Sequence, residues 1–372
     1  MNAPKSIAEC FAVLNDNRQG PHKLHKLYDI LVIALCATVC GADSYYDMSI
    51  FGMCRERWLR KYLGLELPHG IPSHDTFNRV FQSLDPQLFE ACFRIWVDQI
   101  REVLRNEVIA IDGKALKSVP TPNGNIPYIV SAWASAQDLV IGQVKTDEKS
   151  NEITAIPELL NILALNGCIV TIDAAGCQKK IVSKIVEKNA DYMIGLKGNQ
   201  PTMLEEMALM FDDALESNPN AFAHFTTIDK QAGRIEERTC YQTSKLKWFQ
   251  DKDEWAGLRS VCRVDSKRTV KGVESNETRY YISSLKVNPE KALATIRAHW
   301  GIENKLHWVL DVEFGEDRSR VRKLNAAQNL NTMKKFALDF LRKDKTTNHI
   351  LKKKRRIMMW DDEMLQRIIV GK

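Results

Sequence analysis

The chain has 372 residues, of which 44% are hydrophobic and 27% charged, and its formal net charge is +6. This length predicts two or three domains, and the composition is that of a folded globular protein. The mild positive charge permits a polyanionic partner without requiring one. Nine cysteines follow no repeated spacing. This favours reduced thiols in a cytoplasmic protein over a disulfide-stabilised secreted fold.

Residues 1–106 are predicted to form a helical domain. The most apolar stretch of the chain, Ile30–Cys40, is well short of the roughly 18 residues that a membrane span needs. We therefore expect a buried helix there and no membrane partner. Cys36 and Cys40 are four residues apart, but no His or Cys pair near them completes a zinc site, so we interpret both as core residues.

The same domain contains a possible DNA-binding segment. The helix predicted over "SYYDMSIFGMCRERWLRKYLGL" has a basic cluster between Arg55 and Lys61 on its polar side. Ser73 is a typical N-cap for the next, short helix, and Asp85 and Pro86 begin another. Two short helices around the Gly-Ile-Pro turn at 70–72 resemble a helix-turn-helix, which would dock on DNA. A plain helical bundle fits the pattern equally well.

Beyond Val108 the pattern changes to strands and crossover helices. Three strands are predicted at Val108–Ile111, Tyr128–Ala136 and Leu139–Lys145, with short connections that are typical of hairpins. A helix over about Ile153–Leu165 follows, and then a strand, a second helix and the strand "ADYMIGLKG". This order predicts a mixed sheet in an α/β domain.

Two of these strands lead directly into an aspartate. "VIAID" ends at Asp112 and "IVTID" ends at Asp173. If the two strands are neighbours in the sheet, the carboxylates converge, and converging carboxylates require a shared proton or a cation. Aspartate is also a common turn residue, so a structural role for each stays open at this point.

The remaining chain divides into three segments. Residues 202–290 contain a predicted helix and then alternating stretches, which we interpret as a β-rich insertion between two parts of the core, 107–201 and 291–341. A long predicted helix, "NPEKALATIRAHWGIENKLHWVLDV", covers residues 288–312 and leads into the segment 291–341. Residues 342–372 are predicted to be a basic tail, with eight Lys or Arg against one Asp between positions 342 and 356.

The long helix supplies a third carboxylate. Its candidates are Glu303, Asp311, Glu313 and Glu316. Glu303 and Asp311 are eight residues apart, or roughly 12 Å along a helix, so they cannot bind one ion together. Glu303 lies on or beside the apolar face, where a carboxylate without a partner is costly. It is therefore the preferred candidate, and a salt bridge to Lys305 or His307 is the alternative.

At this point several motifs together resemble a known family. "AIDGKALK", "DEKSNEI", "IVTIDAAGCQ", "ADYMIGLKGNQ" and "HWGIENKLHWVLDVEFGEDRSRVR" resemble motifs of the ISAs-type insertion-sequence transposases, also called H-repeat-associated proteins. The N-terminal "CGADSYYDMSIFG", "WLRKYLGL" and "GIPSHDTFNRVFQSLDP" resemble the leading domain of that family. The resemblance implies a ribonuclease-H-like core with a helical N-terminal domain.

The resemblance also implies a DDE triad, in which Asp112 and Asp173 match the aspartates and Glu303 matches the glutamate. The wider group of DDE transposases has a tyrosine, an arginine and a lysine at set offsets from the glutamate. This chain departs from that pattern, since Ile296, His299 and Leu310 stand at those offsets.

The expected activity is that of a DNA transposase, with cleavage at the element ends and strand transfer into target DNA. Two Mg²⁺ ions, or Mn²⁺ in their place, would bind the triad, because hard cations prefer oxygen ligands. The expected partner is double-stranded DNA, bound by a dimer. The suggested phosphate or base contacts are Lys114, Lys117, Lys149, Lys179, Lys197, His299, Trp300, Trp308, Arg318, Arg320 and Arg322. An inactive DNA-binding relic and a ribonuclease-H-like nuclease are the alternatives.

Overall fold

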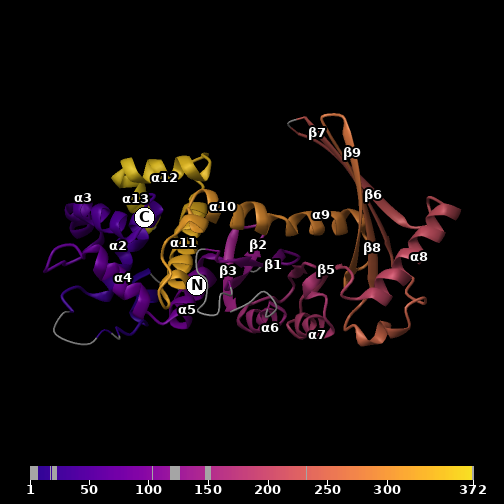
Figure 1. Ribbon diagram of the computed structural model, residues 1–372, viewed down its shortest axis with the longest axis horizontal. Coiled ribbons are helices and arrows are strands. Elements are labelled where there is room, and N and C mark those ends of the chain that lie inside the picture. Colours follow the sequence, from indigo (N-terminus) through magenta and orange to yellow (C-terminus); the bar gives the residue numbers. More distant parts are fainter. Residues whose placement is uncertain are drawn as a thin grey trace.

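The computed structural model describes residues 7–16, 18, 23–102, 104–117, 126–146, 152–231 and 233–370. The molecule is elongated, with a helical layer at one end, a central sheet between helices, and a tall β-sheet arm at the other end (Figure 1). Lys149, one of the suggested phosphate contacts, lies outside the described residues. No helix within these ranges is long and apolar enough to cross a membrane.

Side-chain caps mark the start of three of the five N-terminal helices in the described residues, α3 (Tyr45–Leu63), α4 (His74–Ser83) and α5 (Pro86–Ile100). The other two are α1 (Ile7–Ala12) and α2 (Leu27–Val39). Ser44 and Asp47 form a reciprocal capping box at the start of α3, and Gly64 ends that helix with a φ of 66°. The Asp85 carboxylate accepts hydrogen bonds from two backbone N–H groups at the start of α5. The predicted helices of this region are therefore confirmed.

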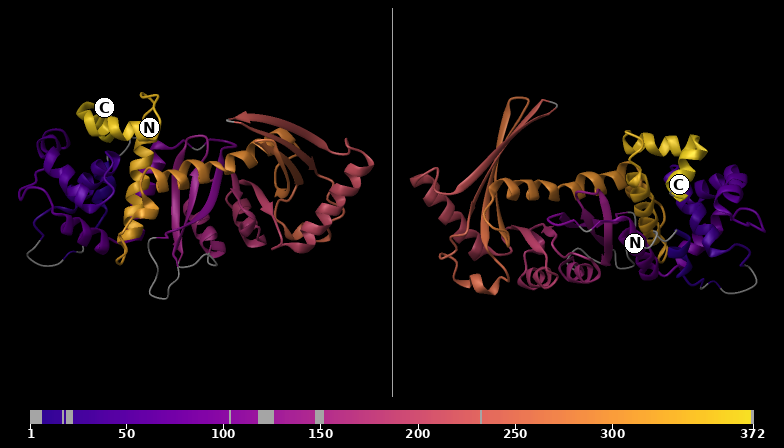
Figure 2. Two further views of the ribbon diagram at one scale, coloured as in Figure 1. Left: turned by 45° about the horizontal axis from the view of Figure 1, so that its top comes forward. Right: turned by 180° about the vertical axis from the view of Figure 1, so that it is seen from behind.

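Three C-terminal helices complete this helical layer: α11 (Ala326–Lys343), α12 (Leu351–Trp360) and α13 (Asp362–Val370). Both views of Figure 2 place them beside the N-terminal helices. Phe336 of α11 is fully buried, and its ring centroid lies 4.9 Å from that of Phe93 and 5.5 Å from that of Trp96. The basic segment 342–372 is therefore not an extended tail in its described part, and its Lys354 and Arg355 are buried.

A nine-stranded sheet runs through the rest of the molecule in the order β3-β2-β1-β4-β5-β9-β8-β7-β6. Its first five strands in the chain are β1 (Val108–Ala115), β2 (Tyr128–Ala134), β3 (Leu139–Thr146), β4 (Ile169–Ile172) and β5 (Asp191–Leu196). Within this part, β1, β4 and β5 are parallel, and β2 and β3 are antiparallel to their neighbours. This is the ribonuclease-H-like mixed sheet that the resemblance implies.

The β-rich region predicted between 202 and 290 is continuous with that sheet. It consists of α8 (Pro201–Ser217), β6 (Ala223–Gln231), β7 (Arg234–Thr243), β8 (Ser260–Val270) and β9 (Val273–Ser283). The antiparallel pairing of β9 with β5, from Met193↔Ser283 to Leu196↔Tyr280, joins the two parts edge to edge. Backbone hydrogen bonds therefore join this β-rich region to β5, the strand next to β4.

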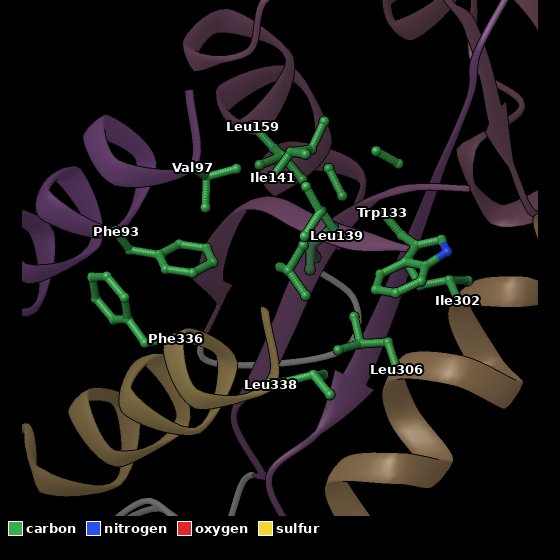
Figure 3. Close-up of a cluster of buried hydrophobic side chains, with 14 of the residues drawn as sticks. Phe93, Val97, Trp133, Leu139, Ile141, Leu159, Ile302, Leu306, Phe336 and Leu338 are labelled. Atoms are coloured by element: carbon green, nitrogen blue, oxygen red, sulfur yellow. The ribbon is translucent and has the colours of Figure 1, made fainter. Parts of the chain in front are cut away.

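Helices cover both faces of the first five strands. Figure 1 shows α6 (Glu152–Ile162) and α7 (Lys179–Glu187) on one face and the long helical run of α9 (Pro289–His299) and α10 (Trp308–Val312) on the other. Figure 3 shows how one apolar cluster joins these layers, with Trp133 and Leu139 of the sheet between Ile302 and Leu306 on one side and Phe93 on the other. All five side chains are buried.

Candidate active site

The two strand-end aspartates lie side by side. In the parallel ladder between β1 and β4, Ile111 pairs with Ile172, so Asp112 and Asp173 are the next residues of the two strands. Neighbouring strands are about 4.8 Å apart. Asp173 follows the last residue of β4 and accepts a 3.0 Å hydrogen bond from the Ala175 N–H. The ladder thus brings the two residues together at one edge.

Glu303 comes from a widened turn of the long helix. Between α9 and α10 the residues Ile302–His307 form a π-helix, in which the Trp308 N–H donates to the Glu303 carbonyl. Ile302 and Leu306 are buried, and this turn packs on β1 and β2. Single π turns within α-helices are frequent at functional sites, because the extra residue changes which side chains face a neighbour. Here the turn lets the helix keep its apolar contacts and present Glu303 beside them.

All three predicted acids line one pocket of about 780 Å³. The pocket lies between the ends of β1 and β4, the start of the π turn and residues 277–281 of β9. Its lining also includes three of the suggested DNA contacts, Lys197, His299 and Trp300, together with Arg279 and Tyr280 of β9. The sequence-predicted triad is therefore brought together in a single cleft that has cationic and aromatic walls.

Burial and neighbouring carboxylates raise the pKa of Asp112 to about 7. Burial is the largest cause, and the charges of Glu152, Asp173 and Glu303 add to it. His307 Nδ1 lies 3.4 Å from Asp112 Oδ2, but burial lowers the His307 pKa to about 3, so this imidazole is neutral at pH 7. It therefore does not offset the crowded negative charge.

Glu152 raises the pKa of Asp112 although it does not line the pocket, and the sequence prediction did not single it out. It is 7% exposed, and a Cβ built on Gly113 would lie only 2.3 Å from its Oε1. The glycine after Asp112 therefore leaves the space that the Glu152 carboxylate occupies. The family motif "DEKSNEI" contains Glu152. However, Glu152 begins helix α6 and does not follow a strand, so the strand-end pattern did not identify it.

Three of the suggested phosphate contacts form ion pairs within the protein. The Lys114 ammonium contacts the carboxylates of Asp311 and Glu316. Lys117 Nζ lies 2.9 Å from Asp317 Oδ2, and Lys179 pairs with Glu254. These charges are already engaged with neighbouring acids. The sequence alone could not reveal this, because the partners are far away in the chain.

The two tryptophans on the long helical run are exposed. Trp300 is 41% and Trp308 is 54% exposed, so the sequence-based expectation that at least one of them packs in the core is wrong. The Arg279 guanidinium lies 5.0 Å from the centroid of the Trp300 ring, at the wall of the pocket. His299 Nδ1 lies 3.0 Å from Thr171 Oγ1, and burial lowers the His299 pKa to about 4. His299 is therefore neutral at pH 7.

The chemistry of the donor set fits a hard divalent cation. Asp112, Asp173 and Glu303 provide only carboxylate oxygens, which Mg²⁺ and Mn²⁺ prefer. In the described ranges, however, no three His, Cys, Asp or Glu side chains are gathered closely enough to hold a metal ion. Mutual repulsion of ionised carboxylates favours such a separation when no cation lies between them.

The chain is similar to known proteins over most of its length. Residues 105–340 match the family model described as "Transposase DDE domain", and residues 8–97 match "DDE_Tnp_1-associated". The chain belongs to the DDE transposase family.

Full-length relatives support the assignment. The chain is 41% identical over 359 residues to "Putative transposase YncI" of Escherichia coli O157:H7, with 95% of this chain and 91% of that protein covered. It is 38% identical to "H repeat-associated putative transposase YhhI" of Escherichia coli K12, with 99% and 98% covered. The resemblance to H-repeat-associated transposases is thereby confirmed.

One solved structure is also similar. It is the piggyBac transposase synaptic complex with hairpin DNA, determined by cryo-EM. The TM-score is 0.44 at 12% sequence identity, and the match covers 97% of this chain and 76% of that chain.

Proposed function

We propose that the chain cleaves DNA at the ends of its own mobile element and joins the freed 3′ ends to target DNA. The observation that carries this proposal is the pocket in which Asp112 and Asp173, at the ends of adjacent parallel strands, face Glu303 of the π turn. Phosphodiester cleavage requires an activated hydroxyl in line with phosphorus and stabilisation of an anionic transition state. A cluster of carboxylates does this through divalent cations.

In this proposal Asp112, Asp173 and Glu303 hold the metal, and Glu152, which lies near Asp112 outside the pocket lining, raises the Asp112 pKa. When bound, two Mg²⁺ or Mn²⁺ ions would lower the pKa of the attacking oxygen and stabilise the leaving one. Lys197 of the pocket wall would bind a phosphate next to the cut. The exposed indole of Trp300 would stack on a base that leaves the helix there.

The same site would serve both reactions in turn. Water is the first nucleophile, and the freed 3′-OH is the second. Because two element ends are joined to one target, we expect a dimer on double-stranded DNA. Because the substrate is chromosomal DNA, we expect the protein to act in the bacterial cytoplasm, at the nucleoid.

Two alternatives differ in what they predict. An inactive relic would bind DNA without cutting it, and a simple nuclease would cut without joining. The presence of all three acids in one pocket favours the enzyme over the relic.

The test uses the purified full-length protein with Mg²⁺ and labelled duplexes that carry the element ends, with a plasmid as target. Wild type should produce both cleaved and joined DNA, and Glu303→Gln should produce neither. Glu313→Gln, ten residues further along, removes the same charge outside the pocket and should retain both activities. No cleavage by well-folded wild-type protein would support the relic, and cleavage without joining would support the nuclease.

A further inference from the structure

A second pocket, of about 620 Å³, lies apart from the carboxylates, between the helical layer and the segment that follows α10. One wall consists of the first turns of α3 and α4, with Ser44, His74 and Asn78. The opposite wall is the stretch from Gly315 to Lys323. We call this second pocket the arginine groove. None of the three carboxylates of the predicted triad lines it.

The arginines of this groove point outward in an alternating pattern. Arg318, Arg320 and Arg322 are exposed, whereas Ser319 and Val321 between them are half-buried. Val321 packs against the main hydrophobic core. Arg318 is the last residue of a short 3₁₀ helix, Glu316–Arg318, and Ser319 after it has an extended backbone. The alternating burial from Ser319 to Arg322 is typical of an extended chain, in which every second side chain lies on the same face. One face of this segment is therefore anchored and the other is a row of guanidinium groups.

These cations are available to a ligand. Within the described part of the chain, Arg318, Arg320 and Arg322 form no ion pair with an acidic side chain. The one acid among the lining residues is Asp43, whose Oδ1 lies 3.8 Å from the Arg355 guanidinium of α12. The lining of the groove is thus strongly cationic.

The acids of the same segment fix it to the strand that carries Asp112. Glu316 is 5% exposed, contacts the Lys114 ammonium of β1, and accepts a 2.5 Å hydrogen bond from Asn331 Nδ2 of α11. Asp317 pairs with Lys117 at 2.9 Å. The acids face inward to the protein and the arginines face outward. The position of the arginine row is therefore tied, through two lysines of one stretch of chain, to the candidate active site.

The wall formed by the start of α3 and α4 also favours an anion. α4 has ten residues and begins in the groove at His74, so its N–H groups and the positive end of its dipole lie at that wall. His74 and Asn78 add side chains that can donate hydrogen bonds to phosphate oxygens.

We propose that the arginine groove binds the sugar-phosphate backbone of duplex DNA outside the cleavage pocket, with Arg318, Arg320 and Arg322 each placed against a phosphate. This proposal rests on the proposed function and adds where the DNA lies on either side of the active site. Contacts to phosphates carry no sequence information, so the groove sets the position and orientation of the duplex. It also uses residues from both ends of the chain.

The experiment measures equilibrium binding of the full-length protein to a mixed-sequence DNA duplex by fluorescence anisotropy, over a series of salt concentrations. The test variant replaces Arg318, Arg320 and Arg322 with Gln. Its affinity at low salt should fall at least about tenfold. The slope of log K against log salt should decrease in magnitude by about 0.9 for each phosphate that the variant no longer neutralises. Thermal melting confirms that the variant is folded.

Arg259→Gln is the matched control, since Arg259 is exposed and lines neither pocket. It should bind like wild type. An unchanged affinity and salt slope in the triple variant would overturn the inference, and so would tighter, arginine-dependent binding of a double-stranded RNA of the same length. The two proposals fail separately. Cleavage together with unchanged binding in the variant removes only the groove, and arginine-dependent binding without cleavage removes only the catalytic proposal.

Discussion

Replacement of Asp112 by Asn tests the central electrostatic feature of the site. Asn keeps the shape and the Oδ1 acceptor, to which the Gly113 N–H donates at 2.9 Å. It removes an ionisable carboxyl group whose pKa rises from 3.8 to about 7 in the folded protein. A shift of roughly 3 units at 1.36 kcal/mol per unit corresponds to about 4 kcal/mol as an upper limit. This is the free energy by which ionised Asp112 destabilises the metal-free fold.

The effect has a defined direction with pH. Because the folded pKa of Asp112 is above the unfolded value, ionisation opposes folding. The stability contributed by this residue is present below about pH 4 and is lost as the pH rises through about 7. Asp112→Asn should therefore be more stable than wild type at about pH 8 in chelator, by up to several degrees in Tm, and similar to it at about pH 4.

The assay is thermal melting of both proteins across this pH range, with and without Mg²⁺, paired with cleavage of end-bearing DNA by the same preparations. Mg²⁺ should raise the Tm of wild type and have less effect on Asp112→Asn, because a ligand stabilises only the state that binds it. Cleavage should disappear in the variant. A variant that is less stable than wild type at about pH 8, or a stability difference that does not change with pH, would refute the reasoning.

Three further predictions follow from the packing of the site and the helical layer. Gly113→Ala should destabilise the fold by about 1–3 kcal/mol, because the new Cβ would overlap the Glu152 carboxylate. Chemical denaturation should show this destabilisation reduced when Glu152→Ala is added, and two additive effects would contradict the close contact. Phe336→Ala should cost about 3–5 kcal/mol, since its ring is fully buried between helices from both ends of the chain. Leu324→Ala, at a side chain that is 79% exposed, is the control that should change the unfolding midpoint little. Glu303→Gln should lose Mg²⁺-dependent stabilisation in calorimetry, and Mg²⁺ binding equal to that of wild type would exclude it as a ligand.

Local patterns in the sequence were sufficient for the core of the sheet. β-branched runs that end in Asp112 and Asp173 predict strands, because such side chains favour the extended backbone. The caps at Ser44 and Asp85 predict where helices begin, because their oxygens accept from unpaired N–H groups. The preference for Glu303 over Asp311 came from helical rise and the apolar face beside Glu303. In the structure Glu303 lines the pocket with both aspartates, and Asp311 pairs with Lys114.

Other features depended on contacts between distant parts of the chain. The sequence predicts residues 1–106 as a separate domain because their pattern is helical and changes to strands at Val108. The structure adds α11 to their core, since an apolar face can be buried by any segment that reaches it. The sequence predicts the β-rich region as an insertion. In the structure the edge strand β9 pairs with β5 through backbone hydrogen bonds, so the region continues the central sheet. Neither outcome is visible in local periodicity.

The site itself shows the same division. The sequence by itself determined which acids are held at strand ends and on the late helix, because backbone geometry sets those positions. Only the tertiary structure decided that Glu152 reaches Asp112 across Gly113. It also decided that Lys114 and Lys117 are paired with acids, whereas Arg318, Arg320 and Arg322 remain exposed. The charge of a side chain is encoded locally, but its partner depends on which distant residues folding brings within a few ångströms.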